Sequence, residues 1–413
     1  MCPADNSTSP TSGTSGPKAD GSGAYNPAAG YLNAEARRSL ASPAYSSSAP
    51  STIDIPRDTV IKRMFLRLVM SVTGTYSSGS PLYDQKGAFE RICSNVEINI
   101  NGNRVVKSVR PHMMRLHNIL TSGALPRRAY ATSATAFTVG RADAEWLAGT
   151  IAYPATTQYT LFNEGFELSF ENPFGYGGSR HMSELDVRDV ASATAKFYWQ
   201  PATNLQSDAT SPATVTYTNL SAVVTPQIIE NRARPRPVAG QVLYDYVETS
   251  FSRSYTGQAR SNQIDLQTGN YLMGIGILAQ NGDSAYTLLE TLLTNMALMI
   301  NGANAIQGPV SHADLQDSNQ IRFGADDKIG LAEYNATIAS VAKVHPLRGF
   351  ALMNLIRNGN WNTAINTSRQ AGVDAVKLQF DTPSTSGTDA ATYTNNLSVV
   401  VHSHEMRPFA YSR

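Results

Sequence analysis

The chain has 413 residues, which is too many for one ordinary hydrophobic core and favours two or more globular units. Its 33 basic and 32 acidic residues almost cancel, which excludes the basic field that drives sequence-independent binding to nucleic acid. The two cysteines, Cys2 and Cys93, are too few for a disulfide framework or a cysteine-based zinc site.

Charged residues make up 16% of the chain, below the roughly 25% of ordinary soluble domains, and 19 Tyr outnumber 13 Phe. This composition favours a surface built for contacts, because buried interfaces are rich in Tyr and poor in Lys, Glu and Asp. A neutral solitary domain fits the composition equally well. The N-terminus lacks a charged-then-apolar signal sequence, and no stretch approaches the 18 apolar residues of a membrane span. We therefore expect a soluble chain that is not exported.

Residues 1–52 are rich in Ser, Thr, Gly, Ala and Pro and poor in large apolar groups. Such a segment cannot bury enough surface to offset the loss of chain entropy, so we predict a disordered N-terminal arm. Within it, Leu32, Ala36 and Leu40 recur at helical spacing, which predicts one short amphipathic helix. The helix would become ordered on a neighbouring subunit or on a lipid surface. A plain linker is the simpler alternative.

From Ile53 the chain changes to short runs of β-branched and aromatic residues, separated by clusters of Gly, Asn, Pro and Ser. This pattern is typical of an all-β domain. Its clearest element is a hairpin, in which the alternating residues of 96–100 lead into the pair Asn101-Gly102. Asn-Gly is the favoured two-residue type I′ turn, because both of its positions need a positive φ.

The same hairpin recurs at an offset of 301 − 101 = 200, where Met296, Leu298 and Ile300 alternate into Asn301-Gly302. Four further blocks repeat in the same order, with offsets that fall in one direction from 211 through 184 and 181 to 176. Because loops absorb length changes while strands keep their length, this ordered drift favours a duplicated unit. The paired blocks are Ile53-Asp54-Ile55 with Ile264-Asp265-Leu266, Gly165-Phe166 with Gly349-Phe350, Ala195-Lys196-Phe197 with Val376-Lys377-Leu378, and residues 216–224 with residues 392–400.

Two copies of about 170 residues suit eight-stranded jelly rolls. We therefore predict an all-β chain of two tandem eight-stranded jelly-roll sandwiches, a double jelly roll, with short helices in the connections. A segment rich in Thr, Ala and Gly at residues 131–159 is expected to be a loop at one end of the first roll. The predicted units are the arm at 1–52, the first jelly roll at 53–230, an extended linker at 231–260 and the second jelly roll at 261–413.

One pattern resembles a metal site. In the run Val401-His402-Ser403-His404-Glu405, alternate strand positions place both imidazoles on one face, and a carboxylate follows. A complete site would need a further Glu and another His, and neither is evident nearby in the sequence. His112 and His312 recur in the repeat, which indicates a structural role near a strand-to-helix turn.

Other chemistry is sparse. No phosphate-binding glycine motif and no nucleophile elbow occurs in the sequence, and nothing marks an acid and base pair among the loosely clustered carboxylates, which are expected at the surface. We therefore expect no catalytic, cofactor-binding or metal-binding residues, no cofactor and no enzymatic activity. The loosely clustered carboxylates are those of Glu167, Glu171, Glu184 and Asp186.

Two segments resemble a known family. Residues 61–68 and 89–102 look like the opening strand and the following helix, strand and hairpin of the double jelly-roll major capsid proteins of tailless icosahedral bacteriophages with an internal membrane. The resemblance extends over residues 53–413. It implies that three subunits close a homotrimer of six similar barrels, and that this pseudo-hexameric capsomer self-assembles into an icosahedral shell.

The resemblance also implies location and partners. The protein would be made in the host cytoplasm and lie in the virion, in the capsid shell. It would contact copies of itself, vertex and minor capsid proteins, and an internal lipid membrane through the arm, with no specific nucleic acid. The alternative is a tandem β-sandwich carbohydrate-binding protein, which would need exposed aromatic platforms. Of Trp146, Trp199 and Trp361, we expect Trp199 to be core, because it lies in an apolar strand run.

Overall fold

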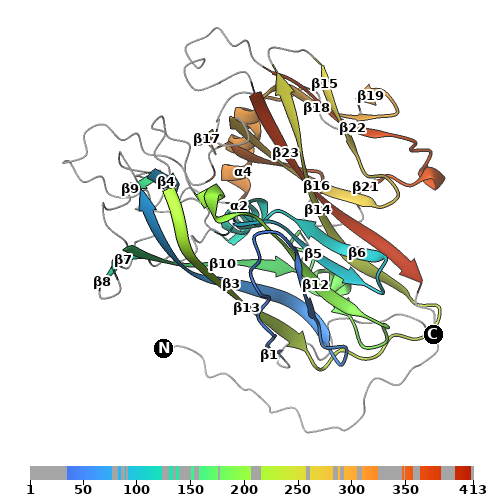
Figure 1. The fold of residues 1–413 in the computed structure, drawn as a ribbon. Helices are drawn as coiled ribbons and strands as arrows, with labels where there is room; N and C mark the ends of the chain where they lie inside the picture. The colour runs from blue at the N-terminus through green and yellow to red at the C-terminus, as the bar shows by residue number, and fades with distance from the viewer. Residues whose placement is uncertain are drawn as a thin grey trace, which may run out of the picture.

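The computed structural model shows a mostly β protein with two stacked lobes (Figure 1). It describes residues 35–410, and residues 1–34, which make up most of the predicted arm, lie outside the description. Within 35–410 the description omits residues 77–81, 85–88, 90–91, 123–129, 134–135, 139–149, 153–157, 175–176, 206–214, 257–260, 282–286, 289–292, 305–308, 324–346, 348, 357–362 and 383–395.

A five-stranded antiparallel sheet forms the outer layer of the first unit, in the order β1-β13-β3-β10, with β11 also paired to β3. Along β3 the side chains alternate: Met64, Leu66 and Leu68 are buried, whereas Phe65 and Arg67 point to solvent. The strands are β1 (Glu35–Ser39), β3 (Val60–Tyr76), β10 (Gln158–Ser169), β11 (Leu185–Asp186) and β13 (Val215–Asn231).

A ten-stranded sheet runs through both units in the order β17-β16-β23-β14-β6-β5-β12-β2, with β20 and β21 also paired to β16. The units meet where β14 pairs with β6 in parallel, Glu248 opposite Lys107 and Thr249 opposite Ser108. The strands are β2 (Ser51–Asp54), β5 (Cys93–Ile100), β6 (Arg104–Val109), β12 (Ala193–Trp199), β14 (Val242–Thr256), β16 (Tyr271–Asn281), β17 (Thr287–Leu288), β20 (Phe350–Asn354), β21 (Ile365–Asn366) and β23 (Asn396–Ala410).

A four-stranded sheet, β15-β22-β18-β19, forms the outer layer of the second unit, and two strand pairs, β4-β9 and β7-β8, complete the described sheets. No helix in the described residues is long and apolar enough to cross a membrane. These elements are β4 (Leu82–Asp84), β7 (Tyr130–Ser133), β8 (Ala136–Thr138), β9 (Thr150–Ala152), β15 (Asn262–Leu266), β18 (Thr294–Ile300), β19 (Ala303–Asn304), β22 (Val376–Asp381), α2 (Pro111–Ser122), α4 (His312–Phe323) and the 3-10 helices η1 (Gly177–Ser183), η2 (Ala202–Leu205) and η4 (Arg369–Ala371).

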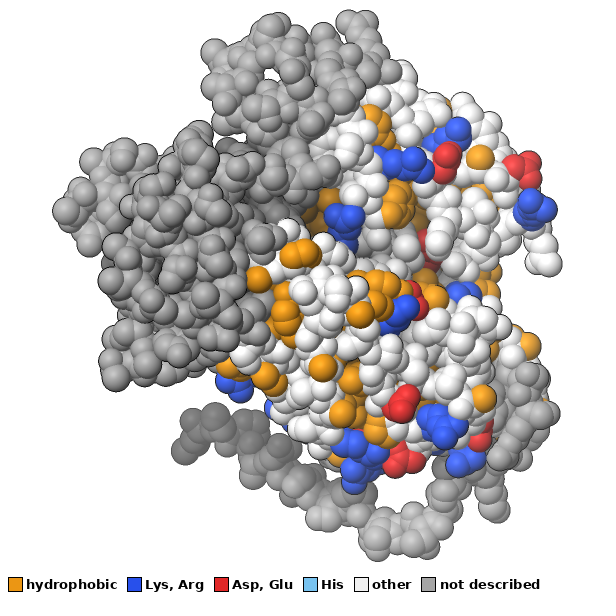
Figure 2. Space-filling model, viewed as in Figure 1, with side chains coloured by type: hydrophobic (Ala, Val, Ile, Leu, Met, Phe, Trp, Pro, Cys, Tyr) orange, Lys and Arg blue, Asp and Glu red, His pale blue; other side chains and the backbone are white. Residues whose placement is uncertain are grey.

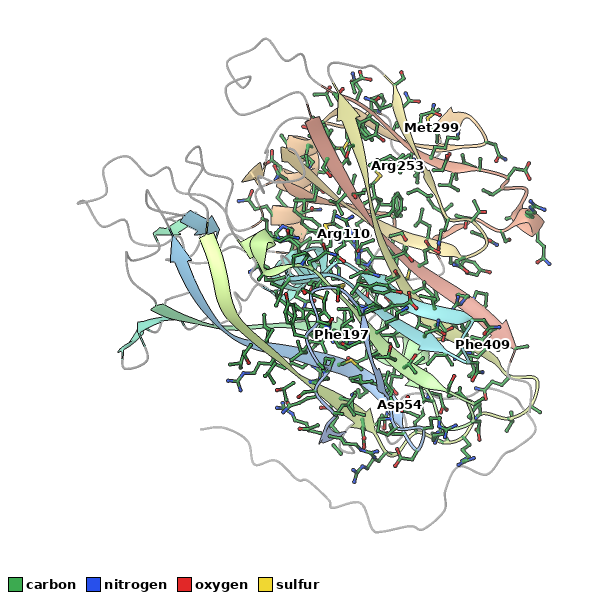
Figure 3. All side chains as sticks on the ribbon, in the orientation of Figure 1. Asp54, Arg110, Phe197, Arg253, Met299 and Phe409 are labelled. Atoms are coloured by element: carbon green, nitrogen blue, oxygen red, sulfur yellow. The ribbon has the colours of Figure 1, made fainter. Side chains whose placement is uncertain are left out.

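Each unit buries its own apolar cluster between two sheet layers. The first cluster contains Phe197, which lies inside the lower lobe in Figure 3, and the second contains Phe380. A third cluster lies between the units, where Met113 and Leu116 of α2 pack against residues of β16, β20 and β23. The prediction of an all-β double jelly roll is therefore confirmed, and α2 fills the space between the two rolls.

The duplication extends to tertiary contacts. Asn101 and Gly102 both have positive φ, as do Asn301 and Gly302, so the two predicted turns have the expected backbone. Downstream, Ala195 pairs with Ile98 and Leu378 pairs with Leu298, which gives a structural offset of 378 − 195 = 183. The sequence alignment of this block, at 181, was wrong by two residues. A shift of two preserves which side chains face the core, so the alternation could not reveal it.

Three local predictions were wrong. The segment with helical spacing at Leu32, Ala36 and Leu40 contains strand β1, because pairing with the edge of β13 satisfies its backbone groups. The expected linker at 231–260 contains β14, which pairs along its length with β23. The expected loop at 131–159 contains, in its described parts, the strand pair β7-β8, strand β9 and the start of β10.

Candidate functional site

A buried polar cluster lies at the junction of the two units. Strand β23 is covered on both faces: Val399 and Val401 belong to the core of the second roll, whereas Val400 belongs to the cluster between the units. His402 and His404 share the face of Val400, because side chains alternate along a strand, and both are fully buried.

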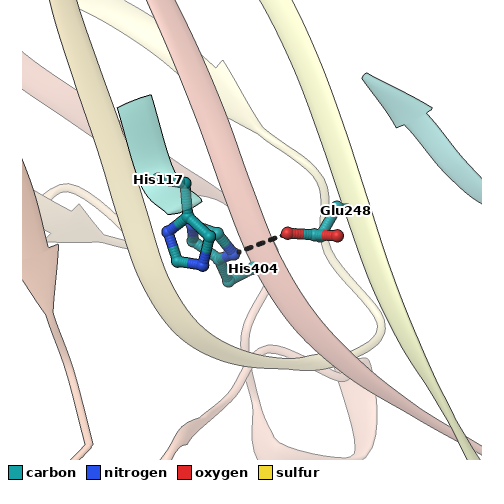
Figure 4. Close-up of side chains that lie close together, drawn as sticks. All are labelled: His117, Glu248 and His404. Atoms are coloured by element: carbon teal, nitrogen blue, oxygen red, sulfur yellow. Dashed lines mark ion pairs between the residues drawn. The ribbon is translucent and has the colours of Figure 1, made fainter. Parts of the chain in front are cut away.

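The two imidazoles on β23 meet a third from α2. The ring centroid of His404 lies 4.5 Å from that of His402 and 4.4 Å from that of His117. The predicted sharing of one face by His402 and His404 therefore agrees with the structure. His117 is the further histidine that the sequence pattern lacked, and Figure 4 shows it beside His404.

Glu248 supplies a carboxylate in the centre of the cluster. Its position in β14 places it opposite His404 of β23 on one side and Lys107 of β6 on the other. Its Oε1 accepts a hydrogen bond from Tyr246 Oη at 2.9 Å and lies 3.3 Å from His402 Nε2 and from His404 Nδ1. Its Oε2 lies 2.6 Å from Lys107 Nζ, so the carboxylate has a partner on both oxygens.

Burial determines the protonation of these groups. It lowers the pKa of His117 well below 6.5 and that of His404 to about 4, so both imidazoles are neutral near pH 7. Burial alone would raise the pKa of Glu248, but Lys107 and the two β23 histidines more than offset it and hold that pKa well below 4.5. The cluster therefore contains the ion pair of Lys107 and Glu248 and two neutral imidazoles, those of His117 and His404.

The carboxylate that the sequence pattern supplied lies apart from this cluster. Glu405 follows His404 in β23, so it points to the opposite face, where its Oε2 accepts a hydrogen bond from Asn270 Nδ2 at 2.6 Å. Burial raises the pKa of Glu405. Glu248 and His117 could not be associated with β23 from the sequence, because they reach it through strand register and helix packing.

A second cluster of acidic and basic groups lies in the first unit. Glu171 and Glu184 are buried, so the expectation that they are surface carboxylates was wrong. His181 Nδ1 lies 3.2 Å from Glu171 Oε1 and 3.0 Å from Glu184 Oε1. Lys62 also pairs with Glu171 at 3.4 Å, and Arg234 pairs with Glu184 at 3.4 Å. Arg234 thus fastens the start of the expected linker to the first roll.

The repeated histidines lie at helix starts. His112 and His312 are both buried in the first turn of α2 and α4, as expected for a strand-to-helix turn. The His312 backbone N–H donates to the Leu293 carbonyl oxygen at 3.0 Å, which ties α4 to the residue just before β18.

No protein-family model and no curated protein sequence matches the chain. Solved structures do. The crystal structure of the STIV major capsid protein superposes with a TM-score of 0.56 at 14% identity, over 90% of this chain and 96% of that one. The structure of Sulfolobus turreted icosahedral virus matches with a TM-score of 0.57 at 14% identity, over 90% of each chain. This chain has the fold of viral major capsid proteins.

The Faustovirus major capsid protein also matches, with a TM-score of 0.53 at 9% identity, over 92% of this chain and 90% of that one. The resemblance drawn from residues 61–68 and 89–102 is thus confirmed at the level of the fold. Because the double jelly roll is found in STIV and Faustovirus, the fold by itself does not specify a bacteriophage.

Proposed function

We propose that this protein is a viral major capsid protein that assembles with copies of itself into the shell of a virion. The observation that carries the proposal is the double jelly roll itself, with its two rolls joined by one continuous sheet. The matched structures support it, because they are capsid proteins or virus particles and are covered over nearly their whole length. A structural role without enzymatic activity accords with this fold.

The proposed capsomer is a pseudo-hexameric homotrimer. Three copies of a two-roll subunit around a cyclic axis present six similar rolls, and a six-sided block can tile the facet of an icosahedron. The surface composition supports extensive contacts between copies. On the face seen in Figure 2, charged side chains are sparse among apolar and uncharged ones. Vertex proteins, minor capsid proteins and an internal membrane are the further partners that we propose.

The carbohydrate-binding alternative needs an exposed aromatic platform. Trp199 is only 6% exposed, packs against Tyr45 and Phe197, and donates from Nε1 to Ser51 Oγ at 2.7 Å, so it is a core residue as expected. Trp146 and Trp361 lie outside the described residues. No observation in the described part of the chain favours this alternative.

Size-exclusion chromatography with light scattering tests the proposal. We expect a stable particle of three times the chain mass of 44.5 kDa, and larger assemblies at high concentration. Electron microscopy of the peak fraction should show six-sided blocks. A monomer at micromolar concentration that binds immobilised glycans would contradict the capsid proposal and support the alternative.

A further inference from the structure

The junction of the two rolls holds three groups that can donate to a metal ion. A nitrogen of His117, a nitrogen of His404 and a carboxylate oxygen of Glu248 all lie within 4.8 Å of one another. They come from three elements, α2, β23 and β14, and all three side chains are buried. His117 belongs to the first roll, whereas Glu248 and His404 belong to the second.

An unpartnered nitrogen of His117 points independently to a ligand. In the described part of the chain, His117 Nδ1 is buried and has no hydrogen-bond partner. A buried polar atom of this kind is normally satisfied by protein, water or an ion, because its desolvation is otherwise uncompensated. The ring of His117 lies 4.4 Å from that of His404, so its imidazole belongs to the same buried polar cluster.

The donor set selects the class of ion. Two imidazole nitrogens and one carboxylate oxygen suit zinc and its neighbours in the first transition row, whereas calcium and magnesium require mainly oxygen donors. Bonds of about 2.0–2.2 Å in a tetrahedral site place the donor atoms roughly 3.3–3.6 Å apart. His404 Nδ1 and Glu248 Oε1 are already 3.3 Å apart, and a nitrogen of His117 lies within 4.8 Å of the donor atoms of both residues.

The groups facing the site permit a cation there. Lys107 approaches Glu248 from the β6 side and contacts Oε2, which leaves Oε1 directed towards the histidines. Ser250 Oγ lies 2.6 Å from His402 Nδ1, so the second β23 histidine is held in place beside the site. Tyr246 Oη lies 2.7 Å from His404 Nδ1 and also donates to Glu248 Oε1, so an ion bound to Nδ1 would take the place of the contact between Tyr246 and His404.

We propose that His117, His404 and Glu248 bind one divalent transition-metal ion of the zinc class. Because its ligands come from both rolls, the ion fastens α2 of the first roll to the β14-β23 pair of the second. Binding of metal to the native protein but not to the unfolded chain then stabilises the junction by mass action.

The cluster of Glu171, His181 and Glu184 in the first unit is the competing location. Its carboxylates already face Lys62, Arg63, Arg180 and Arg234, so a divalent ion there would replace several existing ion pairs. This difference makes His181 the matched control for the junction histidines.

The test uses the full-length protein, stripped with a chelator and titrated with Co²⁺, with Zn²⁺ as competitor. We expect one ion per chain, visible absorption bands typical of low-coordinate Co²⁺, and displacement by Zn²⁺. His404→Gln and His117→Gln should each weaken binding by roughly tenfold or more, since loss of even an outer partner costs that much. His181→Gln should bind as the wild type does. Loss of binding in His181→Gln alone would place the ion at the first-unit cluster and overturn the proposal.

A measurement on the wild type keeps the proposal testable if the junction variants fail to fold. X-ray absorption at the zinc edge should show two imidazoles and at least one oxygen around the bound ion, and Zn²⁺ should raise the thermal midpoint of unfolding. Absence of stoichiometric binding in the stripped wild-type protein would refute the proposal. This outcome is independent of the capsid assignment, which the oligomeric state tests.

Discussion

Lys107 of β6 and Glu248 of β14 form an ion pair across the parallel contact that joins the two rolls, with 2.6 Å between Nζ and Oε2. Both side chains are essentially inaccessible to solvent. Lys107 Nζ also lies 3.8 Å from the ring centroid of Tyr246, on the side where the second roll begins. Desolvation makes a buried ion pair a weak source of net stability, but it penalises any pairing of the units that separates the two charges.

Removal of one member of this pair should be strongly destabilising. We expect Lys107→Met to lower the free energy of unfolding by about 3–5 kcal/mol, because it leaves the Glu248 carboxylate buried without its cation. Denaturant midpoints followed by tryptophan fluorescence measure the change. Lys107→Met combined with Glu248→Gln should recover most of the loss, since no isolated charge then remains. A double variant as unstable as the single one would contradict this account.

The two hairpin asparagines should respond alike to substitution. Asn101 Oδ1 accepts from the backbone N–H groups of Ala191 and Ser192, and Asn301 Oδ1 accepts from those of Asp374 and Ala375. Replacement of either Asn by Ala leaves two N–H groups without this acceptor and places Ala at positive φ. We expect a loss of about 1–2 kcal/mol at each site, mainly from the positive φ, because the lost hydrogen bonds are exposed to solvent.

The matched control for each asparagine keeps the accepting oxygen. Asn101→Asp and Asn301→Asp should retain most of the stability in denaturant titrations. If the Ala variant is harmless at one site and damaging at the other, the two turns do not perform equivalent structural roles, and the duplication would not extend to these contacts.

Strand β1 should detach in acid. A hydrogen bond with Lys62 lowers the pKa of Glu35, a residue of β1, below the ordinary 4.5. A hydrogen bond with Arg38, also in β1, lowers the pKa of Asp58 below 3.8. A carboxylate whose pKa is lower in the folded state stabilises that state above its unfolded pKa, and this contribution disappears as the pH falls through the folded value.

Pulsed hydrogen–deuterium exchange across this range measures the detachment. We expect the protection of the β1 amides, corrected for intrinsic rates, to be constant above about pH 5 and to fall progressively below pH 4.5. The amides of β5, which lie in the core sheet, provide the internal reference. Equal loss of protection in β1 and β5 would indicate global unfolding instead of local detachment.

Two glycines of β16 should differ in their tolerance of a methyl group. A Cβ at Gly276 would lie 3.1 Å from Phe350 Cε2 and 3.4 Å from His402 Cβ, both in buried side chains, whereas a Cβ at Gly274 would meet nothing closer than 3.5 Å. We expect Gly276→Ala to cost about 1–3 kcal/mol through overpacking. Gly274→Ala should be close to neutral in the thermal midpoint. A reversed order would show that Phe350 can move aside freely.

Local signals allowed much of the fold to be predicted. The hairpin turns need positive φ at both positions, and only a few residue pairs adopt it readily. The Asn-Gly pair alone was therefore enough to locate each hairpin. The strand β1 could not be predicted in this way. The apolar residues of this segment do recur at helical spacing. The edge of β13, nearly two hundred residues away in the sequence, provides hydrogen-bond partners for its backbone, and the local spacing of side chains gives no information about such a distant partner.

Only the two β23 histidines of the junction cluster could be predicted from the sequence, for a related reason. His402 and His404 stand two positions apart in one strand, so their common face follows from the sequence. Glu248 and His117 join them through the register of β14 and the packing of α2. Neither the register nor the packing can be predicted from the sequence around residue 402. The burial of Glu171 could likewise not be predicted, because its cationic partner Lys62 lies in β3, far from it in the sequence.

The parallel contact between β6 and β14 also bears on how such a subunit can diverge. Its backbone pairing is made by peptide groups, which every amino acid carries, and the buried Lys107 and Glu248 side chains determine which residues meet there. Substitutions elsewhere in the two rolls therefore leave the way in which the rolls are joined unchanged. The chain shares its fold with the STIV protein over 90% of its length at 14% identity, so two sequences with few identical residues form the same two-roll subunit.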